Sequence, residues 1–121
     1  MSWTIRIDQE QGVVYCALKG AAFREEISVG QNELRDNPDF KPYFRALYDL
    51  RGVTDFDLDA AALRQMSKSN PFDKSGRRAF VVDGKFVHGM IRVYNTYRDE
   101  EAGRIQIFDD MAKAKEWLDI D

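Results

Sequence analysis

The feature that most constrains the fold is the order in which strand-like and helix-like segments follow one another. Residues 4–8 alternate apolar and polar side chains, whereas residues 13–18 form a continuous apolar run. The first pattern is typical of a strand with one solvated face, and the second of a strand covered on both faces. Because the link over residues 9–12 is short and ends in glycine, we predict an antiparallel hairpin.

A helical stripe follows the hairpin, and three strand–helix repeats follow the helix. The stripe consists of Phe23, Ile27, Gly30 and Leu34, and Asn37-Pro38 ends it because a residue before proline avoids helical dihedrals. The first repeat has a strand at 45–50, closed by Arg51-Gly52, and a helix to about residue 69. The second has a strand at 78–82 and a helix at 85–98. The third has a strand at 104–108 and a helix that Asp109 or Asp110 caps and that runs to Leu118. This ββαβαβαβα order predicts an α/β fold with a mixed, mostly parallel five-stranded sheet and about four helices.

Length and the distribution of apolar residues set the expected organisation. At 121 residues the chain suits a single domain over residues 1–121. No apolar run approaches the roughly 18 residues of a membrane span, and the amino-terminal residues lack the layout of a signal peptide. The single cysteine, Cys16, fits a reducing compartment. We therefore expect a cytoplasmic protein in which Cys16 is an inert buried thiol.

The charge balance argues against nucleic acid as a partner. The net charge is −3, so long-range attraction to a polyanion requires a local cluster of basic residues. Basic residues gather only in the segment Lys68–Arg78. We interpret this segment as a solvated, charged turn, with an anion site between the second helix and the fourth strand as the alternative.

Four aspartates crowd around the junction between the third predicted strand and the next helix, in the segment ALYDLRGVTDFDLDAAAL (46–63). Asp59 is a natural N-cap, because its carboxylate can accept the free N–H groups of the first helical turn. Asp55 and Asp57 are expected to form side-chain turns back to the backbone. These assignments give the aspartates a structural role.

A D-x-D-x-D pattern at Asp55, Asp57 and Asp59 also raises the question of a metal site. A helix–loop–helix calcium loop needs glycine at its sixth position and glutamate at its twelfth, where this chain has Ala60 and Met66. An acidic magnesium pocket of the receiver type stays an alternative, because α/β proteins place ligands at the carboxyl ends of their strands. We predict no metal and no cofactor.

Motifs that carry chemistry are few. His88 is the only histidine, and a helical wheel places it beside Arg92 on the polar side of its helix. The sequence contains no phosphate-binding loop at Gly84-Lys85 and no G-x-G-x-x-G fingerprint. We therefore predict that the protein is not an enzyme.

The element order and the segment LYDLRGVTDF (Leu47–Phe56) resemble the SpoIIAA-like (STAS/SEC14-type) family of small bacterial proteins, within the STAS superfamily. The segments HGMIRVY (88–94) and EEAGR with its following strand (100–108) extend the resemblance over nearly the whole chain. It implies the SpoIIAA/STAS fold and a regulatory role like that of the anti-sigma-factor antagonists. Those proteins carry a phosphorylatable serine at the start of the second helix, where this chain reads Asp57-Leu58-Asp59-Ala60. No phosphorylation switch is expected here, and Asp59 would supply a permanent negative charge.

The preferred interpretation is a non-enzymatic regulatory domain that binds a protein partner, or a second copy, through the face around residues 53–63. Two alternatives stay open: a small-molecule or lipid-binding module of the SEC14 type, and an enzyme that uses His88 with a carboxylate. The predicted partner-binding residues are Val53, Asp55, Asp57, Asp59, Leu63 and Arg92.

Overall fold

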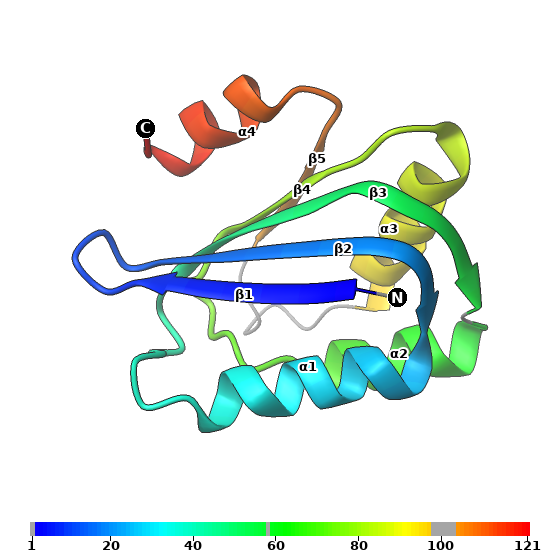
Figure 1. Cartoon of the computed structure of the whole chain (residues 1–121), viewed down its shortest axis with the longest axis horizontal. Coiled ribbons are helices and arrows are strands. Elements are labelled where there is room, and N and C mark those ends of the chain that lie inside the picture. The colour runs from blue at the N-terminus through cyan, green and yellow to red at the C-terminus, as the bar shows by residue number, and fades with distance from the viewer. Residues whose placement is uncertain (1, 58, 98–103) are drawn as a thin grey trace.

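The computed structural model describes residues 2–57, 59–97 and 104–121 (Figure 1). Its elements follow the predicted ββαβαβαβα order: β1 (Ser2–Asp8), β2 (Val13–Phe23), α1 (Arg24–Asp36), β3 (Arg45–Asp57), α2 (Ala60–Lys68), β4 (Arg78–Val81), α3 (Lys85–Tyr97), β5 (Ile105–Phe108) and α4 (Met111–Leu118). Within these described residues, none of the helices combines the length and the apolar character that a membrane span requires.

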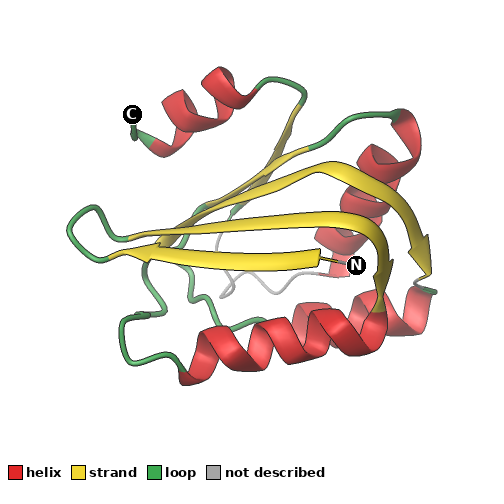
Figure 2. Ribbon diagram, viewed as in Figure 1, coloured by secondary structure: helices red, strands yellow, loops and turns green. Residues whose placement is uncertain are grey.

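The five strands form one mixed sheet in the order β1-β2-β3-β4-β5. β1 pairs with β2 in antiparallel fashion, and every other neighbouring pair is parallel. Helices α1, α2 and α3 cover one face of the sheet, and α4 lies on the other (Figures 1 and 2). The α/β architecture predicted from the sequence is confirmed. We call the face under α4 the outer face.

β2 and β3 are much longer than predicted and continue past the other strands. Residues 19–23 of β2 pair with residues 52–57 of β3, so the expectation that Arg51-Gly52 closes the strand is wrong. The register shifts between Ala17 and Lys19 and again between Gly20 and Ala21, and Gly20 has a φ of 82°. This pair of extensions, which we call the β2–β3 ribbon, curves toward α1 and α2 (Figure 1).

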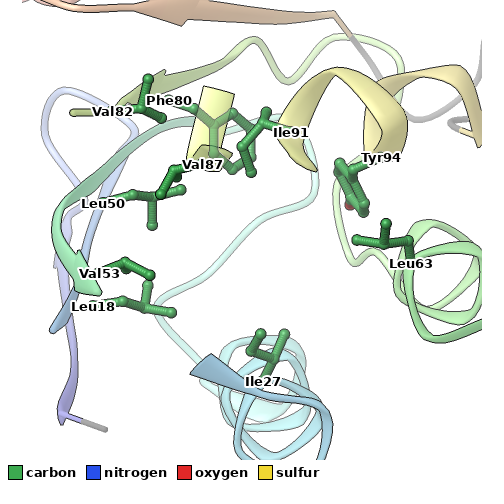
Figure 3. Packing of buried hydrophobic residues seen from close by; sticks show 10 residues of the cluster. All are labelled: Leu18, Ile27, Leu50, Val53, Leu63, Phe80, Val82, Val87, Ile91 and Tyr94. Carbon is green, nitrogen blue, oxygen red and sulfur yellow. The ribbon is translucent and has the colours of Figure 1, made fainter. Parts of the chain in front are cut away.

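The main core lies between the sheet and the three helices that cover it. An aromatic group runs through this core: Tyr48 stacks on Phe80 with ring centroids 4.6 Å apart, and Phe80 meets the edge of Tyr94 at 6.4 Å. Sheet and helix residues converge there, as Figure 3 shows for ten residues of the cluster: Leu18, Ile27, Leu50, Val53, Leu63, Phe80, Val82, Val87, Ile91 and Tyr94. Burial of these side chains holds the helical layer on the sheet.

β1 approaches the helical layer closely where Trp3 meets Gly30 of α1. A Cβ atom added at Gly30 would lie 2.5 Å from Cε2 of the Trp3 indole. Only glycine leaves room for the indole at this distance. The helical spacing that includes Gly30 therefore marks a contact between α1 and the edge strand of the sheet.

On the outer face, α4 covers only part of the sheet. Its Ala114 and Leu118 pack against Leu47, Ala79 and Val81 of β3 and β4. Outward-facing residues of β1 and β2 such as Thr4, Arg6 and Lys19 are exposed, and none of the helices in the described part of the chain lies over them.

Candidate functional site

The predicted partner-binding residues divide into exposed charges and buried apolar side chains. Asp55, Asp59 and Arg92 are exposed. Val53 and Leu63 have exposed fractions of only 7% and 4% and belong to the main core. Their side chains support the surface from beneath and do not contribute to it. The backbone of Asp57 ends β3, and its side chain lies outside the described residues.

Asp59 is the N-cap of α2, as predicted. Its Oδ1 accepts a hydrogen bond of 2.8 Å from the backbone N–H of Ala62, and its backbone is extended, with φ −91° and ψ 179°. The carboxylate also lies at the positive end of the helix dipole. The cap therefore holds an exposed negative charge in one position at the start of α2.

Substitution of Asp59 separates the capping role from the charge. Asp59→Ala removes the acceptor, and we expect it to lower the free energy of unfolding by about 1 kcal/mol. Asp59→Asn keeps an acceptor oxygen, so it should cost only a few tenths of a kcal/mol. Urea unfolding followed by circular dichroism measures both values. Equal losses for the two variants would contradict the capping role.

The other aspartates of this segment differ from the prediction. Asp55 and Asp57 do not form turns, because they lie within β3 and pair with Ala21 and Phe23. Asp49 instead binds Arg51: its two carboxylate oxygens accept hydrogen bonds of 2.9 Å each from the guanidinium. These bonds lower the pKa of Asp49. Among the described residues no group of three or more His, Cys, Asp or Glu side chains could hold a metal ion.

His88 is exposed on α3. It lines none of the cavities described below, and no hydrogen bond or ion pair joins it to a carboxylate in the part of the chain that the structure describes. An enzyme that uses His88 and a carboxylate needs these groups within hydrogen-bond reach. This geometry is not found among residues 2–57, 59–97 and 104–121.

Cys16 lies in the core beside Tyr48, its register partner in β3. Its exposed fraction is 3%, and burial raises the pKa of its thiol to about 12, although a hydrogen bond from Tyr48 acts in the opposite direction. Burial likewise raises the pKa of Tyr48. A thiol with so high a pKa holds almost no thiolate at neutral pH, so it is a poor nucleophile.

We therefore expect a thiol reagent such as 5,5′-dithiobis(2-nitrobenzoate) to react with Cys16 only when the chain unfolds. At about pH 8 the folded protein should release thionitrobenzoate at the rate of global unfolding, and denaturant should bring the reaction to completion. The same reagent on free cysteine supplies the reference rate. Reaction of the folded protein at the rate of free cysteine would contradict the burial of this thiol.

The basic segment 68–78 does not gather its cations around one point. Lys74 is exposed, as expected for a solvated turn, whereas Lys68 is exposed at the end of α2. Arg77 Nη1 donates a 2.8 Å hydrogen bond to the carbonyl of Trp117, toward α4. Arg78 has an exposed fraction of 2% and donates from Nη1 to the Tyr94 hydroxyl at 3.0 Å, on the opposite side of the sheet. The two arginines thus lie toward different faces of the sheet, which argues against a single anion site that uses both.

A cavity of about 60 Å³, which we call the core cavity, lies between the sheet and α1, α2 and α3. Its walls are mostly aliphatic and aromatic, and the lining residues that carry polar groups are Trp3, Gln31, Tyr48, Arg78 and Tyr94. Trp3 Nε1 and Gln31 Oε1 are buried and have no hydrogen-bond partner within the described residues. One donor and one acceptor are thus available to a small guest molecule or to water.

Comparison with known proteins identifies the fold. No protein-family model matches the chain, and no curated protein matches it. An uncharacterized protein of the DUF3478 family with a SpoIIAA-like fold, from Shewanella loihica PV-4, superposes with a TM-score of 0.62 at 22% identity, over 97% of this chain and 92% of that one. The anti-sigma factor antagonist SpoIIAA in its unphosphorylated form gives a TM-score of 0.57 at 10% identity, over 98% and 96%. The SpoIIAA-like fold implied by the sequence resemblance is confirmed.

Proposed function

We propose that this chain, a single domain over residues 1–121, is a non-enzymatic regulatory domain of the cytoplasm that binds a protein partner. The contact surface, which we call the α2 surface, consists of Asp55, Asp57 and Asp59 with Arg92 of the neighbouring α3. One observation carries the proposal: the capping bond of Asp59 holds an exposed carboxylate at the start of α2. The resembled antagonists carry a phosphorylatable serine in this region.

The α2 surface suits recognition by charge. Fixed charges that complement a partner raise the association rate and exclude partners of the wrong sign. Because the cap fixes Asp59, little side-chain freedom is lost on binding. Val53 and Leu63 hold the surface from below as part of the core. A fold similar to that of an anti-sigma factor antagonist adds support for a protein partner.

Cross-linking capture from a bacterial lysate, read by mass spectrometry, tests the proposal with a matched pair of variants. Asp55→Asn with Asp59→Asn removes two charges from the α2 surface and keeps the cap. Glu33→Gln with Asp36→Asn removes two exposed charges from α1. We expect the protein captured by the unmodified chain to be lost from the first variant and retained by the second. Retention by both variants, or loss from both, would count against the α2 surface.

The core cavity supports a second candidate function, the binding of a small molecule. Its unpartnered donor at Trp3 and acceptor at Gln31 would orient a guest in an otherwise apolar space. At 60 Å³ it accommodates about two water molecules at roughly 30 Å³ each. A ligand of several hundred daltons would therefore have to separate the helical layer from the sheet. Within that layer, a hydrogen bond of 3.2 Å from Gln31 to the carbonyl of Met66 ties α1 to α2.

Native mass spectrometry of the protein purified from its native host tests this second function. A bound adduct whose removal changes the fluorescence of Trp3 would support it. Trp117→Phe leaves Trp3 as the sole tryptophan, because the chain has two. Adduct-free protein whose Trp3 emission is unchanged after extraction with organic solvent and refolding would exclude it.

A further inference from the structure

The outer face of β1, β2 and β3 beside α4 carries two adjoining hollows of about 560 and 400 Å³. We call this region the open sheet face. Its charged lining consists of Arg6, Lys19, Arg51 and Lys115 with one carboxylate, Asp49. Its net charge is therefore +3, whereas the whole chain carries −3. The rest of the molecule accordingly carries −6, so positive charge is concentrated on this face.

Most of these cations are available to a ligand. Asp49 engages Arg51, and Asp83 adds a weaker attraction from the end of β4. Arg6, Lys19 and Lys115 form no ion pair within 4.0 Å with any carboxylate of the described residues. Longer-range attraction acts between Asp8 and Arg6 and between Asp49 and Lys19.

Arg6 is also held in place by an aromatic ring. Its guanidinium carbon lies 4.1 Å from the centroid of Tyr15 on the neighbouring strand. Stacking fixes the plane of the guanidinium and leaves its N–H edges open to planar acceptors such as carboxylates. On the far side of the hollow, Met111 and Lys115 of α4 form the opposite wall. The face thus combines a fixed guanidinium, a flexible ammonium and apolar contact area.

We propose that the open sheet face binds an acidic segment of a partner protein, with carboxylates on Arg6, Lys19 and Lys115 and apolar side chains against Met111. Charge complementarity carries this choice of partner. A short acidic segment fits within the positive patch, whereas a nucleic acid or an anionic membrane would also meet the net negative charge of the remaining surface. The site lies on the opposite side of the sheet from the helical layer and has the opposite sign to the aspartates of the α2 surface, so it does not depend on the function proposed above.

Fluorescence anisotropy with a fluorescein-labelled peptide of alternating glutamate and phenylalanine tests the proposal. The matched control peptide has glutamine at every glutamate. Arg6→Glu with Lys115→Glu reverses two charges on the open sheet face, and Lys68→Glu with Lys74→Glu makes the same change in net charge at the end of α2 and in the turn that follows. We expect at least about a tenfold loss of affinity for the first pair and less than about a twofold change for the second.

Nuclear magnetic resonance supplies a measurement that needs no variant. Titration of the unmodified protein with the acidic peptide should shift the backbone amides of Arg6, Tyr15 and Lys19 and leave those of α2 unchanged. The proposal is overturned by an equal loss in both double variants, by equal binding of the glutamine peptide, or by absence of binding at low salt. Two other results would overturn it by identifying a different occupant. One is tighter binding of single-stranded DNA or of phosphatidylserine vesicles than of the acidic peptide. The other is head-to-tail self-association that the first double variant abolishes.

Discussion

Replacing Phe80 with alanine should lower the free energy of unfolding by about 3–5 kcal/mol. The Phe80 ring is 6% exposed, stacks on Tyr48 with an interplanar angle of 9° and contacts Tyr94 through a T-shaped arrangement. Its removal would also enlarge the core cavity, which Phe80 lines, and an enlarged void adds to the lost transfer energy. Urea unfolding monitored by circular dichroism gives the value directly.

Two substitutions serve as controls for Phe80→Ala. Phe80→Leu keeps an apolar side chain of intermediate size, so it should cost less than the alanine variant. Val93→Ala on α3 alters a side chain that is 40% exposed, and its effect should stay within about 0.5 kcal/mol. A Phe80→Ala variant as stable as Val93→Ala would show that the aromatic group does not organise this core.

Gly30→Ala should destabilise the protein by about 1–3 kcal/mol, against the usual preference of helices for alanine. The added methyl group would lie 2.5 Å from Cε2 and 2.9 Å from Nε1 of Trp3. Either the indole or α1 has to move, and both line the core cavity. The change in the free energy of unfolding and in Trp3 fluorescence reports this displacement.

Gly89→Ala is the matched control, because Gly89 also lies within a helix, and a Cβ atom there meets nothing within 4 Å. This variant should be stabilised by about 0.5–1 kcal/mol. The two glycine variants are thus expected to differ in sign. Substitution of Trp3 by a smaller residue in the Gly30→Ala background should recover part of the loss, and failure of this recovery would assign the destabilisation to another contact.

The fold was largely predictable from the sequence because its strands and helices carry clear apolar periodicities. Asp59 caps α2 as predicted, and of the two candidates Asp109 and Asp110 it is Asp110 that caps α4. The β2–β3 ribbon was not predictable, since residues 19–23 and 52–57 contain glycine, lysine and aspartate, which are uncommon in strands. Pairing between the two segments, and not local propensity, keeps them extended.

The candidate sites were less predictable because they depend on which side chains face each other across the sheet. The sequence placed Arg78 at the end of a basic segment that we interpreted as a solvated turn. In the structure it shares one face of β4 with Phe80 and is buried. Its place two residues before an inward-facing phenylalanine was the available signal. The open sheet face gathers Arg6, Lys19 and Lys115 from three elements, and only the strand register and the position of α4 bring them together.

Gly20 and Gly52 lie side by side where the β2–β3 ribbon leaves the rest of the sheet, since Lys19 pairs with Gly52 and Gly20 with Val53. α1 starts at Arg24 and α2 at Ala60, directly beyond the ribbon. Because α1 and α2 both follow the ribbon in the chain, its curvature sets where the two helices begin relative to the sheet. The size of the core cavity is thus coupled to the curvature of two strands whose far ends do not line it.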